Sequence, residues 1–175
     1  MAARKTSAES KIIRAEDINT ASIKPNDLIE VTSVTTGELI LIGGKTRRLY
    51  RWKNYGDAEY VEYQDLLAEK YNSSSKYLYD PLFVINSTEV TDQPDWKKVR
   101  ELYDSVLSAE EMDKLFSLDL SSFERTLKSL PKGLRNSVKA KAASKILDGS
   151  LDSINKIKKI DEILGSDLFG SYIGG

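Results

Sequence analysis

The sequence predicts an α+β fold in which a small antiparallel β meander is followed by a helical bundle, with extended N- and C-terminal arms. Residues 28–67 contain four short runs of β-type residues separated by turn signals. The second half repeats apolar residues every three or four positions, which is the period of amphipathic helices. With 175 residues, 40% of them hydrophobic, the chain is long enough to bury a core.

The pattern divides the chain into four parts, which fit one domain or two small ones that share an interface. They are an extended N-terminal arm (residues 1–27), a β-rich part (28–90), a helical part (91–165) and a C-terminal tail (166–175). The four strands of the meander are expected at residues 28–35, 38–42, 47–52 and 59–63. Glycines mark the turns between them, because glycine readily adopts the positive φ angles of tight turns.

Two more elements are expected in the β-rich part. A helical pattern begins at Gln64, directly after the last alternating strand. A connector rich in serine and tyrosine then leads to Leu82-Phe83-Val84-Ile85. This continuous apolar run is typical of a buried strand, so we expect a fifth strand there.

The first half of the helical part shows three helix starts. Asp92-Gln93-Pro94 suits a helix start with proline in the first turn, and the following apolar residues predict one amphipathic helix over 96–107. The segments 108–111 and 121–124 both have the S-x-x-E spacing of a capping box, in which a hydroxyl and a carboxylate satisfy the first free amides of a helix. Two short helices are therefore expected there.

The second half predicts two longer helices. Pro131 interrupts the apolar pattern, and the next helix is expected to end just before Gly149, in the usual position of a C-terminal capping glycine. Ser150 is expected to open the last helix, which ends at Gly165.

Both ends of the chain carry apolar residues in segments that are not expected to fold alone. Residues 1–27 are polar and aperiodic except for Ile12-Ile13 and two isolated isoleucines, which predicts either a disordered tail or an arm that orders only against a partner. The tail is rich in glycine yet apolar, so we expect it to dock on another surface. The predicted partner-binding residues are Ile12, Ile13, Phe169, Tyr172 and Ile173.

Composition excludes several kinds of chemistry. The chain has no cysteine, hence no disulfide or thiolate, and no histidine, the side chain most used as a general base and a zinc ligand. The net charge of −1 argues against attraction of the whole molecule to nucleic acid or membranes. No signal peptide or membrane-spanning run is evident, which predicts assembly in a cytoplasm. We predict no cofactor, no metal and no catalytic residue.

Gly43-Gly44-Lys45-Thr46 has the composition of the end of a phosphate-binding loop. The full motif requires a glycine where this chain has Leu39, and it requires a helix where this chain has the strand-like residues 47–52. We therefore interpret the segment as a hairpin turn. Tyr50 and Trp52 alternate with arginines, which predicts that the aromatic rings face the core rather than stack on nucleic-acid bases.

Charged residues suggest two further hypotheses. Acidic residues such as Asp65 and Glu69 could form the carboxylate pair of a hydrolase, but we interpret them as solvent-facing charges. Residues 125–159 hold ten basic and two acidic residues, whereas 54–124 hold sixteen acidic and six basic ones. We interpret the two stretches as complementary, within one molecule or between copies. The alternative is that the basic helices bind nucleic acid.

Several segments together resemble proteins of tailed bacteriophages, over about residues 28–168. The segments that carry the resemblance are Tyr50-Arg51-Trp52-Lys53-Asn54-Tyr55-Gly56-Asp57 with the acidic strand after it, Asp65-Leu66-Leu67, Leu130-Pro131-Lys132-Gly133, Gly149-Ser150-Leu151-Asp152-Ser153 and Ile163-Leu164-Gly165. Such proteins are virion structural components without catalytic residues. The resemblance therefore implies a non-enzymatic virion subunit.

The leading hypothesis is a bacteriophage virion structural protein, assembled in the host cytoplasm, that attaches to neighbouring capsid, neck or tail subunits through its terminal arms. Repetition in a symmetric multi-copy assembly would turn modest single contacts into firm attachment. The alternative is a nucleic-acid-binding regulator that uses the basic helices in residues 125–160. A carboxylate hydrolase ranks third.

Overall fold

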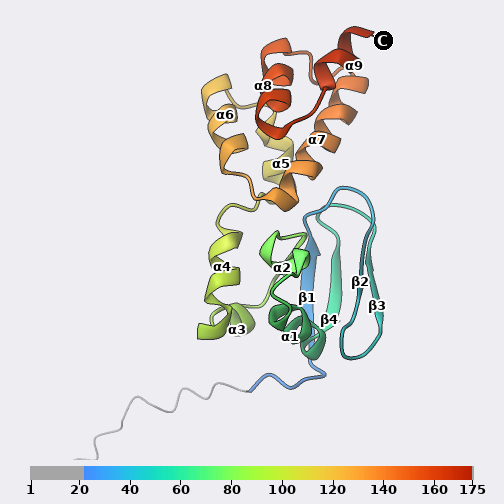
Figure 1. Cartoon of the computed structure of the whole chain (residues 1–175), viewed down its shortest axis with the longest axis vertical. Coiled ribbons are helices and arrows are strands. Elements are labelled where there is room, and N and C mark those ends of the chain that lie inside the picture. Colours follow the sequence, from blue (N-terminus) through green and yellow to red (C-terminus); the bar gives the residue numbers. More distant parts are fainter. Residues whose placement is uncertain (1–21, 175) are drawn as a thin grey trace, which may run out of the picture.

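The computed structural model describes residues 22–174, and Figure 1 shows a β-rich half and a helical half stacked along the long axis of the molecule. The α+β class is confirmed, with antiparallel strands followed by helices. Most of the predicted N-terminal arm, including Ile12 and Ile13, lies outside the described residues.

In residues 22–174, five strands form two small antiparallel sheets. They are β1 (Leu28–Ser33), β2 (Leu39–Ile42), β3 (Leu49–Trp52), β4 (Ala58–Glu62) and β5 (Phe83–Ile85). Each element of the predicted meander exists, but β1 pairs with β4 and β5 instead of with β2, in the order β4-β1-β5. Strands β2 and β3 form a separate hairpin. Side chains attach the hairpin to the three-stranded sheet: the ring of Trp52 stacks on Phe83, and its indole N–H donates to the carbonyl of Val31 at 2.8 Å.

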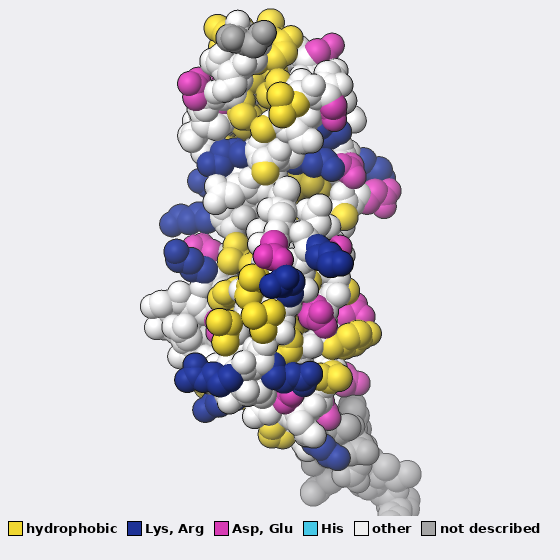
Figure 2. Space-filling model, turned by 90° about the vertical axis from the view of Figure 1, so that its right-hand side faces the viewer, with side chains coloured by type: hydrophobic (Ala, Val, Ile, Leu, Met, Phe, Trp, Pro, Cys, Tyr) yellow, Lys and Arg dark blue, Asp and Glu magenta, His cyan; other side chains and the backbone are white. Residues whose placement is uncertain are grey.

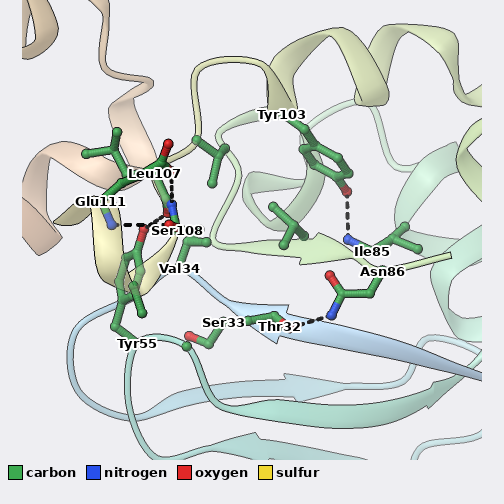
Figure 3. A pocket seen from close by; sticks show the side chains of 14 residues that line it. Thr32, Ser33, Val34, Tyr55, Ile85, Asn86, Tyr103, Leu107, Ser108 and Glu111 are labelled. Carbon is green, nitrogen blue, oxygen red and sulfur yellow. Dashed lines mark hydrogen bonds between the residues drawn. The ribbon is translucent and has the colours of Figure 1, made fainter. Parts of the chain in front are cut away.

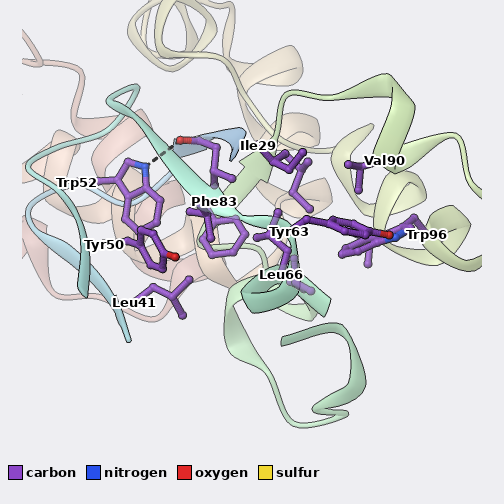
Figure 4. Packing of buried hydrophobic residues seen from close by; sticks show 14 of the residues in the cluster. Ile29, Leu41, Tyr50, Trp52, Tyr63, Leu66, Phe83, Val90 and Trp96 are labelled. Atoms are coloured by element: carbon purple, nitrogen blue, oxygen red, sulfur yellow. Dashed lines mark hydrogen bonds between the residues drawn. The ribbon is translucent and has the colours of Figure 1, made fainter. Parts of the chain in front are cut away.

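The first hydrophobic core lies between the hairpin, the three-stranded sheet and the helices that follow (Figure 4). Phe83 is at its centre, stacked on Trp52 at 5.7 Å and on Tyr77 at 5.8 Å between ring centroids. Tyr50 and Trp52 face this core while Arg51 between them is exposed, so the prediction from their alternation is confirmed. Trp96 also packs here, which extends the first core beyond residue 90.

The predicted helices occur in the expected order with shifted boundaries, and the short helices at residues 76–79, 88–91 and 168–174 were not predicted. They are α1 (Tyr63–Tyr71), α2 (Lys76–Tyr79), α3 (Thr88–Thr91), the 3-10 helix η1 (Pro94–Trp96), α4 (Lys97–Tyr103), α5 (Ala109–Leu115), α6 (Leu120–Ser129), α7 (Lys132–Leu147), α8 (Ile154–Leu164) and α9 (Leu168–Gly174). Ser108 and Glu111 form the predicted capping box of α5. Helix α6 is capped by Asp119, not Ser121, because the Asp119 carboxylate accepts from the amides of Ser121 and Ser122.

Two glycines end helices as predicted, and one helix start was placed too early. Gly149 follows α7 and Gly165 follows α8, both with positive φ, of 75° and 68°. Helix α8 begins at Ile154 rather than at Ser150, because the chain first closes the end of α7: the amide of Leu151 donates back to the carbonyl of Lys145 at 2.9 Å, and the extended Ser153 precedes the first helical residue.

The single helix predicted over 96–107 is wrong, because α4 ends at Tyr103. Val106 and Leu107 keep the apolar spacing but lie on the connector to α5. They pack against a second hydrophobic core, which helices α5 to α8 form around Phe123, Leu134 and Ile157, whereas Val99 packs against the first core. Helix α4 therefore ends where the chain passes from the β-rich half to the helical half.

The C-terminal tail is also not extended. Residues Leu168–Gly174 form helix α9, which packs on α8. Asp161 of α8 holds its first turn, because its carboxylate accepts from the amides of Leu168 at 2.8 Å and Phe169 at 2.9 Å. Partial burial opposes ionisation of Asp161, but these bonds and one from the Ser166 hydroxyl keep its pKa below the ordinary value.

Helix α7 joins the two halves. The Ser137 hydroxyl donates to the carbonyl of Val34 at 2.9 Å and accepts from the amide of Thr36 at 3.0 Å. Gly133, one turn earlier, lies so close to the chain at Asp80 and Pro81 that a Cβ there would collide with both of their carbonyl oxygens. The junction therefore depends on a glycine and a buried serine.

Replacing Ser137 with alanine is expected to destabilise the fold by about 1–3 kcal/mol, since a buried acceptor and a donor both lose their partner. Urea unfolding measures the loss, with Ser144→Ala, an exposed position on the same helix, as the matched control. Equal stability of the two variants would contradict this account of the junction.

Candidate functional site

A cleft of about 450 Å³ lies where the two halves of the molecule meet (Figure 3). Strands β1 and β5 form one wall, and the connector between α4 and α5 forms the other. Its apolar lining includes Val34, Val84, Val106 and Leu107. Ligand pockets in proteins commonly have volumes of about 300–1,000 Å³. The cleft falls within this range, so it is large enough to receive apolar side chains from a partner.

Two tyrosines fix the walls of the cleft. The Tyr103 hydroxyl accepts from the amide of Ile85 at 3.2 Å and so covers the outer edge of β5. The Tyr55 hydroxyl donates to the carbonyl of Leu107 and so ties the β3–β4 turn to the connector. Burial raises the pKa of both phenols, and for Tyr55 the negative charge of Glu111 raises it further. Both hydroxyls therefore stay neutral at ordinary pH.

The rim of the cleft is polar and acidic. Glu111 lines it, and hydrogen bonds from Ser108 lower the pKa of this carboxyl, so that it is ionised near neutral pH. Asn86 lines it from the other wall and donates to the Glu30 carboxylate at 2.9 Å. The lining contains no lysine or arginine among residues 22–174. The cleft therefore favours an apolar occupant with positive charge beside it.

Sequence reasoning missed this cleft because Val106 and Leu107 were assigned to a helix. One signal was available. The capping box at Ser108 starts a new helix at Ala109, so the two residues before Ser108 had to belong to a connector. The cleft itself depends on how the two halves approach, which no local pattern encodes.

The structure separates the predicted partner-binding residues of the C-terminus. Phe169 is half-buried against the second core, with the Lys158 ammonium 4.6 Å from its ring centroid. Tyr172 and Ile173 remain 37% and 67% exposed. Figure 2 shows hydrophobic side chains gathered at the end of the molecule where α9 lies. Ile12 and Ile13 lie outside the described residues, so they are not placed.

The Gly43-Gly44-Lys45-Thr46 segment lies in the turn of the β2–β3 hairpin, as predicted, but the positive φ of this turn is at Arg47 (62°) and not at the two glycines. Its amides do bind an anion, but that anion is the carboxylate of Asp65, which accepts from the amides of Lys45 at 2.8 Å and Thr46 at 3.0 Å. The Tyr50 hydroxyl donates to it at 2.7 Å. Gly43 is needed because a Cβ there would collide with the Asp65 carboxylate.

The prediction that Asp65 faces solvent is wrong, since this side chain is completely buried. Burial favours the neutral acid, but the hydrogen bonds from Thr46, Tyr50 and Lys45 outweigh it and lower the pKa of Asp65. The group is therefore an ionised internal anchor that holds helix α1 against the hairpin.

Many side chains of the basic segment already have partners within the chain. Lys141 pairs with Asp113 at 2.6 Å, and Lys128 pairs with Glu124 at 2.7 Å. Both acidic residues belong to the acidic stretch, so part of the predicted charge complementarity is intramolecular. Lys156 donates to the carbonyl of Phe116 at 2.7 Å. Lys132 and Lys139 make no ion pair among residues 22–174.

Within residues 22–174, no group of three or more acidic side chains is placed to hold a metal ion. No helix in this part of the chain has both the length and the apolar character needed to cross a membrane. Comparisons with models of protein families, with curated proteins and with solved structures gave no match.

Proposed function

We propose that this chain is a non-enzymatic structural subunit of a tailed-bacteriophage virion, which binds neighbouring capsid, neck or tail subunits through its two ends. The observation that carries this proposal is the exposure of Tyr172 and Ile173 on a helix that is itself anchored to the second core. The likeness of its turn and capping segments to tailed-phage proteins supports the virion assignment.

The anchoring of α9 changes how the C-terminal end would act. Asp161 and the half-buried Phe169 hold the helix in place, so its exposed residues are presented in a fixed orientation. A preorganised contact loses less conformational entropy on binding than an arm that must first become ordered. In a symmetric assembly, each copy would repeat the same small contact and attachment would strengthen by avidity.

Incorporation into particles tests this proposal. The double variant Tyr172→Ser/Ile173→Ser removes the exposed apolar contact and leaves Leu168 and Phe169 to dock α9. Deletion of residues 1–21 tests the other end and removes no contact described above. We expect each variant to fold but to be depleted severalfold in purified virions, as measured by quantitative mass spectrometry against a major capsid subunit.

The control is Leu147→Ser, which removes an apolar side chain that is 88% exposed on α7. It should enter particles at wild-type occupancy. Absence of the wild-type chain from purified virions, or wild-type occupancy of both test variants, would refute the proposal. The nucleic-acid alternative predicts tight binding to DNA with a steep salt dependence, which a titration of the purified chain measures.

A further inference from the structure

We propose that the cleft between the two halves is the docking site for the N-terminal segment of a second copy of this chain, with Ile12 and Ile13 as the inserted side chains. This inference deepens the proposed function, on which it rests, by giving the N-terminal contact a receptor. The segment of one subunit would lie in the cleft of the next.

The chemistry of the cleft matches this segment. Val84, Val106 and Leu107 are only half-buried in the free chain, so an inserted apolar side chain would remove their remaining surface from water. Residues 1–21 contain one pair of adjacent large apolar residues, Ile12-Ile13. Lys11 and Arg14 flank this pair directly. The apolar centre of the segment therefore meets an apolar wall.

The charges next to the inserted pair are also opposite in sign to those around the cleft. Glu111 lines the cleft, and Asp104 is exposed on the loop between the lining residues Tyr103 and Val106. Lysines and arginines are absent from the lining within the described range. Lys11 and Arg14, directly on either side of the inserted pair, would therefore approach carboxylates, while Glu9 and Glu16 each lie two residues farther out.

The geometry of the chain favours a second copy over the same copy. The described chain begins at Ser22, and a turn in which the Lys24 amide donates to Asp27 at 2.7 Å fixes its course before β1. The cleft lies at the far end of β1, after six residues of strand, or roughly 20 Å. The nine residues from Ile13 to Ser22 span at most about 32 Å when fully extended. An internal path would have to reverse direction and run back along the whole of β1, whereas a neighbour imposes no such reversal.

Such a contact has a consequence for assembly. The segment and the cleft are different surfaces, so each subunit would offer one donor and one acceptor. Head-to-tail contacts of this kind close into rings or continue as filaments, according to the rotation between neighbours.

Disulfide trapping tests the proposal directly, because the chain has no native cysteine. One variant carries Ile13→Cys, and a second, differently tagged variant carries Val106→Cys inside the cleft. Mixed under mild oxidation, the two are expected to form a disulfide-linked heterodimer. The control receptor is Ile42→Cys, which is exposed on the β2–β3 hairpin away from the cleft. It should give severalfold less product.

A second cysteine position in the cleft controls for any disturbance of the cleft wall by Val106→Cys. Ala109→Cys lines the same cleft at an exposed site, so it should fold normally and trap the same partner. In the donor chain, Lys11→Glu/Arg14→Glu should reduce trapping severalfold at low salt. Arg4→Glu/Lys5→Glu makes the same charge change outside the inserted segment and should leave trapping nearly unchanged.

Equal trapping at Ile42→Cys and at both cleft positions would overturn the proposal. So would a double variant, Ile13→Cys/Val106→Cys, that closes only within single chains at every protein concentration, because the occupant would then be the same copy. The assay uses purified chain alone. Its failure is therefore separate from failure of the virion assignment, which depends on occupancy in particles.

Discussion

Replacing Asp65 with alanine is expected to destabilise the protein by about 3–5 kcal/mol, because several neutral donors would each lose a hydrogen bond to a buried carboxylate, worth about 1.5–3 kcal/mol apiece before relaxation. The Lys45 and Thr46 amides and the Tyr50 hydroxyl would all lose their acceptor. Urea unfolding followed by circular dichroism measures the change. Glu89→Ala, an exposed acid on α3, is the control and should stay within about 0.5 kcal/mol of the wild type.

The pH dependence of Asp65→Asn gives a second measurement at the same site. The pKa of Asp65 is lower in the folded chain than in the unfolded one, where aspartate titrates near about 3.9. Its ionised form therefore stabilises the fold fully above that pH, and this contribution is lost as the pH falls through the folded pKa. The stability difference between wild type and Asp65→Asn should shrink below about pH 4. A difference that stays constant down to pH 2 would contradict the assignment of an ionised anchor.

Replacing Trp52 with alanine is the other change with a large expected effect, about 3–5 kcal/mol. The side chain is 1% exposed, stacks on Phe83 and donates its indole N–H to Val31. Its removal leaves a cavity between the hairpin and the three-stranded sheet, which share no backbone ladder. The hairpin therefore loses a main attachment.

Trp52→Phe separates packing from hydrogen bonding at this position. Phenylalanine keeps a ring beside Phe83 but leaves the Val31 carbonyl without its donor, so a smaller loss is expected. Tyr71→Ala removes an aromatic side chain that is 75% exposed and serves as the surface control. The ranking should be Trp52→Ala, then Trp52→Phe, then Tyr71→Ala. If Trp52→Ala were as stable as the surface control, the hairpin would be held by other contacts.

The local elements were predictable because their signals are local. Alternation placed Tyr50 and Trp52 in the core, and the spacing of Ser108 and Glu111 placed the start of α5. Gly149 and Gly165 marked helix ends because they adopt positive φ angles that other residues avoid. Errors occurred where a side chain from a neighbouring element decided the outcome. Asp161 turns the glycine-rich tail into a helix, and a second core ends α4 early.

The candidate site was only partly accessible to such reasoning. The apolar character of Tyr172 and Ile173 was evident, and the structure leaves both exposed. The cleft was not foreseen, because its walls come from β1, β5 and the α4–α5 connector, which are joined by hydrogen bonds between residues far apart in the sequence, those of Tyr55 with Leu107 and Tyr103 with Ile85. Asp65 was misjudged for the same reason, since its donors lie about twenty positions earlier in the chain.

The sequence by itself determined the α+β class, most strands and helix ends, and the lack of histidine and cysteine chemistry, since period, turn residues and composition act over a few positions. Tertiary structure alone decided that β1 pairs with β4 and β5, that Asp65 is buried against a hairpin turn, and that a cleft opens between the two halves. Those outcomes depend on which distant surfaces exclude water from each other, and burial of that kind is a property of the whole chain.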